Sequence, residues 1–342
     1  MSHFTVLVCI SKERLTSHNN DINSAISEMM EPYQENNSGT CPEKYLTFDD
    51  SEDYYTQEYE SGTSLMYKLP SGRLICKYDS NIKNIDSLEA SEIEISHRKR
   101  YLTFENFMYD YCGNKERDKE TGRYGSWVNE NAKWDYWRIG GRWNGKLYVK
   151  PGTEVTINTG WDSLEDIESN TSDVCKISDL DLDKVQEETV RRAKEFWSEY
   201  TQLLKNGNSD NHDPFDGPRY TALDIGLCKV VKDPTEGKEL GGFRWGDIYS
   251  NKDNDDRRDW YDVYNRDISK EEFLKNYCQY FNPIKTYVAL DDDGWCESGE
   301  MGWFGVDNST PDSKMKYSNN FMQKFILNKD PDTTLVVCDC HI

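Results

Sequence analysis

Phe4-Thr-Val-Leu-Val-Cys-Ile10 lies at one end of the chain and Thr334-Leu-Val-Val-Cys-Asp-Cys-His-Ile342 lies at the other, and these two runs decide the fold. Both are rich in apolar and β-branched residues, which is typical of buried strands. Such sequences are unusual in free chain ends. We therefore predict that both terminal segments are strands of one shared sheet.

The segments between the two ends carry helical and hairpin patterns in turn. Helical spacing or capping signals begin near Ile22, Lys184, Ser269 and Phe321. Hairpins are predicted around Ser71-Gly72 and around Asp291-Asp-Asp-Gly294. This mixture predicts an α+β fold, with a mixed or antiparallel sheet that contains both terminal strands and with helices packed on one side. A ferredoxin-like arrangement elaborated by insertions is one topology that fits.

The length of 342 residues favours two regions or one elaborated domain. We expect residues 1–155 to form an N-terminal α+β region with a tryptophan-rich motif. Residues 156–183 have the acidic, poorly periodic sequence of an excursion or linker. Residues 184–342 are predicted to form a C-terminal α+β region that shares one sheet or an interface with the first.

The charge of the chain argues against general binding to nucleic acids. It has 41 Lys and Arg residues against 63 Asp and Glu residues, a formal net charge of −22. Such a field repels phosphate backbones, so we expect no direct DNA or RNA binding. Two interpretations stay open: an ordinary acidic protein, or one that presents acidic surface to a nucleic-acid-binding partner.

The cysteines and the first residues indicate a reducing compartment. Ten cysteines are scattered along the chain without a C-x-x-C pair, so we predict reduced thiols. The first ten residues have no basic segment and no apolar run long enough for a signal peptide or a membrane span. These features predict a cytoplasmic protein that does not bind membranes.

Four of the ten tryptophans fall between Trp127 and Trp143, beside two arginines and the Gly140-Gly141 pair. Guanidinium groups bind phosphates, and aromatic faces stack on bases, so this motif could hold a nucleotide. A cation–π cluster fastened by Asp135 is the structural alternative. A second glycine pair followed by Arg-Trp, Gly241-Gly-Phe-Arg-Trp245, partially echoes Gly140-Gly-Arg-Trp143. The candidate ligand-binding residues are Trp134, Asp135, Tyr136, Trp137, Arg138, Arg142, Trp143, Arg244, Trp245 and Trp303.

Histidine and aspartate near the two ends form the candidate catalytic site. If the terminal strands pair, His3, Asp339 and His341 come close together and could serve acid–base or metal chemistry. A structural role for these side chains is the alternative. Asp210, His212, Asp213 and Asp216 also have metal-binding side chains, but their spacing is that of an ordinary Asn/Asp/Gly/Pro loop. We therefore expect neither a metal nor a cofactor.

Four segments give the chain a resemblance to a family of bacteriophage and prophage proteins. They are Met1-Ser-His-Phe-Thr-Val6, Lys133-Trp-Asp-Tyr-Trp137 with Gly140-Gly-Arg-Trp143, Gly299-Glu-Met-Gly-Trp303 and Asp339-Cys-His-Ile342. The central aromatic pair reads Tyr-Trp here, where the family has Trp-Tyr. The resemblance spans the whole chain and implies a phage origin, hence action in the cytoplasm of a host bacterium. It supplies no catalytic residue.

Three hypotheses about function follow. The first is a counter-defence protein that sequesters a nucleotide-derived immune signal in the Arg/aromatic pocket, as a binder rather than an enzyme. The second is a phosphodiesterase-like hydrolase that uses His3, Asp339 and His341. The third is an acidic inhibitor that occupies a host defence protein. The expected partner is thus a nucleotide-type small molecule or a host defence protein, and a homo-oligomer is compatible with each hypothesis.

Overall fold

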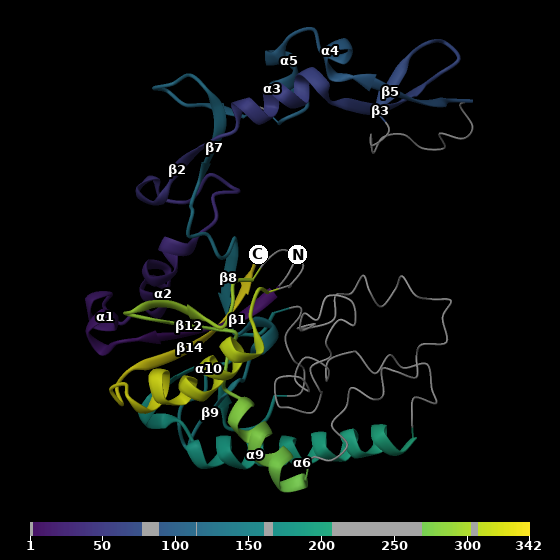
Figure 1. Cartoon of the computed structure of the whole chain (residues 1–342). Coiled ribbons are helices and arrows are strands. Elements are labelled where there is room, and N and C mark those ends of the chain that lie inside the picture. The colour runs from purple at the N-terminus through teal and green to yellow at the C-terminus, as the bar shows by residue number, and fades with distance from the viewer. Residues whose placement is uncertain (1–2, 77–88, 114, 161–166, 207–268, 302–306) are drawn as a thin grey trace. The chain divides into compact units, whose positions relative to one another are not determined.

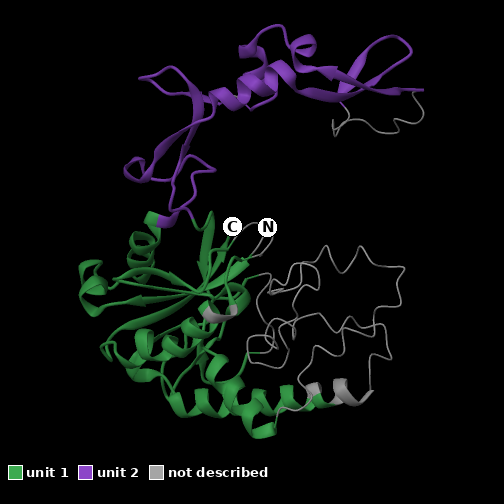
Figure 2. Cartoon of the chain, in the orientation of Figure 1, with its two compact units in different colours: residues 1–32, 133–342 green, residues 33–132 purple. Residues whose placement is uncertain are grey.

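The computed structural model describes residues 3–76, 89–113, 115–160, 167–206, 269–301 and 307–342. The chain divides into two compact units, each described by itself below (Figure 2). Unit 1 contains residues 1–32 and 133–342, and unit 2 contains residues 33–132. This division differs from the sequence-based boundaries at 155 and 183, because the first and last strands belong to one sheet and unit 2 is inserted between two parts of unit 1.

The main sheet of unit 1 has six strands (Figure 1). They are β1 (His3–Ile10), β8 (Tyr136–Ile139), β11 (Val174–Lys176), β12 (Val288–Asp291), β13 (Gly294–Glu297) and β14 (Thr334–His341). β1 pairs antiparallel with β14 along its whole length, from His3 opposite His341 to Ile10 opposite Thr334. The prediction of an α+β fold with both terminal strands in one sheet is confirmed.

The sheet is mixed because β1 also pairs in parallel with β12, which turns back into β13. A ferredoxin-like split βαβ unit separates its two parallel strands by a third strand. Here β1 and β12 are hydrogen-bonded neighbours, so the ferredoxin-like topology is not the one formed. The hairpin predicted at Asp291-Asp-Asp-Gly294 is the β12–β13 turn.

Both faces of the sheet are covered, rather than the one side that the sequence suggested. Every residue from Phe4 to Ile10 is buried, which requires apolar partners above and below the strand. On one face, Leu7 and Val337 pack with two phenylalanines. Phe321 belongs to α10 (Pro311–Met322), and Phe325 belongs to the π-helical turn η8 (Gln323–Leu327). Helix α2 (Ile22–Met30) follows α1 (Lys12–Ser17) and contacts β1. Its buried apolar side chains are Ala25, Ile26, Met29 and Met30.

Strand β14 has two successive partners along its outer edge. β11 pairs with its first part and β8 with its last part, and the exchange takes place at Val337. The amide of Gly140 donates to the Val337 carbonyl, and the Val337 amide donates to the carbonyl of Asp173. The loop between β8 and β9 (Leu147–Tyr148) therefore leaves the sheet beside the last strand.

A layer of helices lies next to this core. Helix α6 (Leu182–Asn206) packs against α9 (Lys270–Tyr280), where Ala193, Phe273 and Tyr277 are buried. Ser269 caps α9 with its hydroxyl, as the capping signal predicts. β9 pairs with β10 (Thr171–Ser172), and short 3-10 turns occur at Glu31–Tyr33, Gly141–Trp143 and Ile177–Asp179.

Unit 2 contains two small antiparallel sheets and short helices. One sheet has β2 (Thr47–Asp50), β7 (Tyr124–Val128) and β6 (Glu116–Arg117), and the other has β4 (Leu74–Cys76), β3 (Thr63–Lys68) and β5 (Ser91–Ser96). Its aromatic core packs Tyr101, Phe107, Met108 and Tyr124 together. The remaining elements are a 3-10 turn at Glu43–Tyr45, α3 (Glu52–Ser61), α4 (His97–Arg100) and α5 (Phe104–Asp110).

Candidate functional site

The register of three strands brings the predicted catalytic residues together at one end of the main sheet. His3 of β1 lies opposite His341 of β14, and Asp339 lies two residues before His341. Residues i and i+2 of a strand share a face, so His341 and Asp339 project to the same side. Arg138 of β8 lies opposite Asp339 from the other edge of β14. The sequence-based grouping of His3, Asp339 and His341 thus corresponds to a real cluster.

Asp339 is the centre of this cluster. Its side chain is 1% exposed and contacts His3, whose Nδ1 lies 2.8 Å from Oδ1. Its Oδ2 accepts from Nη2 of Arg138 at 3.1 Å and from the backbone amide of Arg142 at 3.2 Å. A buried carboxylate is tolerated when donors of this kind compensate for the lost hydration. Asp339 therefore holds the His3 ring and the Arg138 guanidinium in fixed positions.

His341 has its own carboxylate partner. Its Nδ1 lies 2.6 Å from Oδ1 of Asp135, and the amide of Asp135 donates to the carbonyl of His341 at 3.0 Å. The His3 and His341 rings meet edge to face with their centroids 4.9 Å apart. The His3 and His341 side chains are 17% and 14% exposed, respectively, so solvent reaches both.

The two carboxylates select the same tautomer in both rings. An ionised carboxylate only accepts hydrogen bonds, so each Nδ1 carries a proton. The Nε2 atoms of His3 and His341 then have lone pairs, and no partner for either atom occurs among the described residues. Two imidazoles with available Nε2 atoms therefore lie side by side at the surface.

The Gly140-Gly141 pair allows the backbone to approach this cluster. Both residues have positive φ values, 73° and 61°. A Cβ atom on Gly141 would lie 2.5 Å from Oδ2 of Asp339, and one on Gly140 would lie 2.3 Å from Oδ2 of Asp173. Glycine is the residue that accepts both this backbone conformation and this contact. The pair serves the packing of two buried carboxylates.

Asp173 is the second of these carboxylates, and sequence reasoning did not single it out. It accepts from the backbone amides of Gly145 at 2.6 Å and Asn158 at 2.5 Å. Burial raises its pKa, and the hydrogen bonds from Asn158 and Gly145 oppose that change. A lone Asp in a polar stretch carries no sequence signal for such a role.

The predicted ligand-binding residues occupy different environments. Trp134 is buried, and its Nε1 donates to the Met30 carbonyl at 3.0 Å, so it belongs to the core of unit 1. Tyr136 is exposed, and the partly buried Trp143 packs against the main core. Asp135 and Arg142 belong to the His/Asp cluster through the contacts above. Arg244, Trp245 and Trp303 lie outside the described residues, as does the loop with Asp210, His212, Asp213 and Asp216.

Trp137 and Arg138 line a cavity of about 400 Å³. Its wall also includes Asn158 and Asn23. The volume falls within the range of small-molecule pockets, about 300–1,000 Å³. The cavity therefore adjoins the cluster through Arg138, which contacts Asp339 as well.

The described residues contain neither an arranged group of metal ligands nor a membrane-spanning helix. No group of three or more His, Cys, Asp or Glu side chains is arranged there to hold a metal ion. None of the helices in the described ranges combines the length and apolar character needed to cross a bilayer. No disulfide joins the nine cysteines within the described ranges.

Comparison with known proteins gave no match: no family model, no curated protein and no solved structure is significantly similar to this chain.

Proposed function

We propose that the cluster of His3, His341, Asp339, Asp135 and Arg138 is an acid–base site that hydrolyses a small phosphodiester. The observation that carries this proposal is the pair of imidazoles 4.9 Å apart, each held by a carboxylate at Nδ1. Histidine changes charge near neutral pH, so two adjacent imidazoles can act as base and acid in one reaction. The proposal extends the second of the three sequence-based hypotheses.

The surroundings of the two histidines assign their roles. The charge of Asp339 is balanced by Arg138, whereas Asp135 meets no Lys or Arg among the described residues. We assign His341, whose carboxylate partner has no cation beside it, as the acid that protonates the leaving oxygen. His3 is then the base that takes a proton from the attacking water at Nε2. Hydrolysis needs no other group to balance its protons.

Substrate size and class follow from the cavity and the charge. Trp137 offers an aromatic face and Arg138 a guanidinium to a ligand in the 400 Å³ cavity, which suits a nucleotide. The net charge of −22 opposes the approach of a long polynucleotide. A cyclic or short oligonucleotide signal is the substrate class that fits both features.

The test is turnover of cyclic mononucleotides and dinucleotides by the purified chain in EDTA, with products identified by mass spectrometry. His3→Gln and His341→Gln should each lower kcat by about 100-fold or more, because each removes a proton-transfer group. His18→Gln is the matched control, since His18 also pairs with a carboxylate, that of Glu28, and should retain full activity. Equal activity in all three variants would reject the acid–base site.

Sequestration without turnover is the second candidate, and the cavity lined by Trp137 and Arg138 favours it. A binder would release intact nucleotide on denaturation, whereas a hydrolase would release product. His3→Gln and His341→Gln would then leave the affinity unchanged, and Trp137→Ala would lower it. A counter-defence role, which the phage origin implied by the resemblance motivates, is compatible with either outcome.

A further inference from the structure

The cavity lined by Trp137 and Arg138, called the Trp137 cavity from here on, has two side-chain carboxamides in its wall. Asn23 comes from the first turn of α2, and Asn158 comes from the segment between β9 and β10. A carboxamide has a donor nitrogen and an acceptor oxygen on the same carbon, and the two atoms favour opposite groups on a ligand. Which atom a ligand meets depends on what holds the other one.

A buried carboxylate fixes the carboxamide of Asn158. Asp173 is fully buried, and its Oδ2 accepts from the backbone amide of Asn158 at 2.5 Å and from Asn158 Nδ2 at 3.4 Å. The Oδ1 atom of Asp173 accepts from the backbone amide of Gly145 at 2.6 Å. Both oxygens of Asp173 thus act as acceptors, so the nitrogen of the Asn158 carboxamide must face them. The opposite orientation would bring two oxygens together.

The Oδ1 atom of Asn158 is left for a ligand. It accepts no hydrogen bond from any residue within the described ranges, and the residue is exposed to solvent. A Cβ atom on Gly140 would lie 2.9 Å from the Asn158 carbonyl oxygen, so the turn that follows β8 lies directly against the Asn158 backbone. This contact holds Asn158 beside the strand that carries Trp137. The cavity therefore has one acceptor in a set orientation.

Asn23 is not constrained in this way. Its backbone amide donates to Asp21, but its exposed carboxamide forms no hydrogen bond among the described residues. A carboxamide that is free to rotate can turn either its nitrogen or its oxygen to a ligand. Asn23 can therefore add affinity for many ligands without favouring one of them, whereas Asn158 favours a donor.

We infer that the Trp137 cavity selects nucleotides whose base carries an amino group, adenine over hypoxanthine and cytosine over uracil. The base stacks on Trp137, and its amino group donates to Oδ1 of Asn158. A base with a carbonyl at the same place would set oxygen against oxygen. Asp173 is a positioning residue, since it acts through Asn158. The inference rests on the proposed function in taking a nucleotide as the ligand, but it does not require hydrolysis.

Calorimetric titration of the full-length protein with the 5′-monophosphates of adenosine, inosine, cytidine and uridine tests the inference. These ligands contain no phosphodiester bond, so binding is measured without turnover. Each amino base should bind about threefold to tenfold more tightly than its carbonyl counterpart, as expected for one neutral hydrogen bond. Asn158→Ala should bring both ratios to about one. Asn23→Ala should weaken all four ligands alike and keep the ratios.

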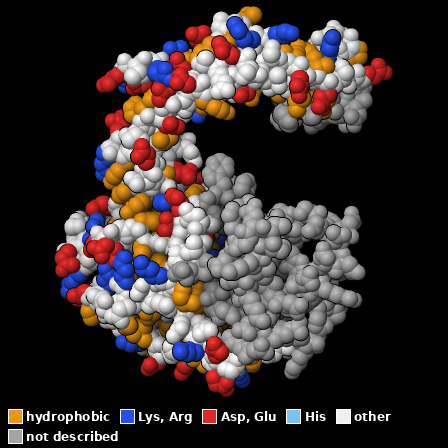
Figure 3. Space-filling view, in the orientation of Figure 1, with side chains coloured by type: hydrophobic (Ala, Val, Ile, Leu, Met, Phe, Trp, Pro, Cys, Tyr) orange, Lys and Arg blue, Asp and Glu red, His pale blue; other side chains and the backbone are white. Residues whose placement is uncertain are grey.

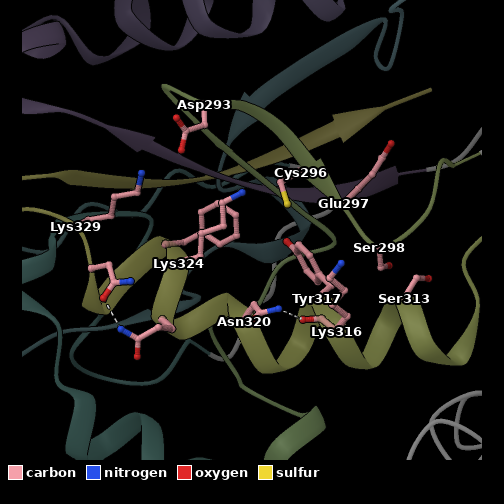
Figure 4. A pocket seen from close by; sticks show the side chains of 13 residues that line it. Asp293, Cys296, Glu297, Ser298, Ser313, Lys316, Tyr317, Asn320, Lys324 and Lys329 are labelled. Atoms are coloured by element: carbon pink, nitrogen blue, oxygen red, sulfur yellow. Dashed lines mark hydrogen bonds between the residues drawn. The ribbon is translucent and has the colours of Figure 1, made fainter.

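Two further variants separate positioning from folding. Asp173→Asn should lower both ratios because the Asn158 carboxamide loses its fixed orientation, and a thermal melt establishes that the variant is folded. Asn320→Ala is the control outside the Trp137 cavity. This exposed asparagine lines another cavity, beside α10, and its Nδ2 donates to the Lys316 carbonyl at 2.9 Å (Figure 4). The control variant should bind all four ligands as the wild type does.

The outcomes distinguish this inference from the proposed hydrolase. Equal affinities for amino and carbonyl bases in the wild type, or unchanged ratios in Asn158→Ala, would overturn the inference and leave the acid–base site standing. Base selection by a protein that hydrolyses no phosphodiester would support the inference and reject the hydrolase. Absence of binding by all four nucleotides would overturn the inference together with the assignment of the cavity to a nucleotide.

Discussion

Asp339 and Gly141 show how single residues shape the candidate site. The buried carboxylate of Asp339 is stabilised by side chains from two neighbouring strands and by the Arg142 amide, which the Gly140-Gly141 turn brings close. The turn is possible because neither glycine has a Cβ atom.

Gly141→Ala should destabilise the protein and disturb the site. The new Cβ would lie 2.5 Å from Asp339 Oδ2 and 2.6 Å from Nε of Arg138. The alanine backbone would also be strained at a φ of 61°. We expect a loss of about 2–4 kcal/mol in the free energy of unfolding, measured by chemical denaturation. Gly152→Ala is the control: its φ is 89°, but no atom lies within 4 Å of the added Cβ. A loss of about 1–2 kcal/mol is expected there, from backbone strain alone. Equal losses would show that contact with Asp339 is unimportant.

At the scale of elements, helix α6 owes part of its stability to a buried carboxylate. The Glu188 side chain is 2% exposed and pairs with Arg191 and Arg192, which are about half exposed. The hydrogen bond from Arg191 lowers the pKa of Glu188 to about 2, against the opposing effect of burial. The pairs at these positions also follow the i, i+3 and i, i+4 spacing that supports helices.

The Glu188→Gln variant should lose less stability than the wild-type protein as the pH falls into the acidic range. A carboxyl group with a lowered folded-state pKa stabilises the fold above about pH 4.5, and this contribution disappears as the pH falls toward 2. Because the arginines are half exposed, we expect the free energies of unfolding of wild type and variant to differ by about 1 kcal/mol at pH 7 and by less at pH 3. Urea denaturation at both pH values measures it. Glu187→Gln, at an exposed neighbouring position, is the control and should change the free energy of unfolding little. A difference between wild type and Glu188→Gln that grows toward acidic pH would contradict the predicted direction.

At the scale of the whole molecule, the two chain ends close unit 1. β1 and β14 are the central antiparallel pair, while unit 2 forms from a single continuous segment between them. On the face drawn in Figure 3, acidic and basic side chains are interspersed over the described surface. The stability of unit 1 should therefore depend on its last residues, and that of unit 2 should not.

Deletion of Cys338–Ile342 should unfold unit 1 selectively. It removes the part of β14 that pairs with β8 and with the first residues of β1, together with the fully buried Cys338 and Cys340. We expect a Tm lower by more than about 10 °C and increased binding of a hydrophobic dye. Hydrogen exchange should remain slow in β3 and β5 of unit 2. An unchanged melting curve would contradict the role of the terminal strands.

Much of the fold could be predicted from the sequence because the decisive signals are local. Continuous apolar runs at Phe4–Ile10 and Thr334–Val337 indicated buried strands, and the Ser269 capping signal located the start of α9. The nearness of His3, Asp339 and His341 followed from assuming that those strands pair. Strand periodicity placed Asp339 and His341 on one face of the last strand, and the register of the pair was needed to place His3 beside them.

Long-range pairing was decided only by the tertiary structure. Nothing local in Tyr136–Ile139 shows that this strand extends the edge of β14, so the contacts of Arg138 with Asp339 and of Asp135 with His341 could not be foreseen. The same holds for burial of Trp134, which depends on the Met30 carbonyl from a distant segment. The sequence by itself determined the elements with strong local signals, such as the two terminal strands and helix α9. The tertiary structure decided which of them meet, because those contacts join segments more than 100 residues apart.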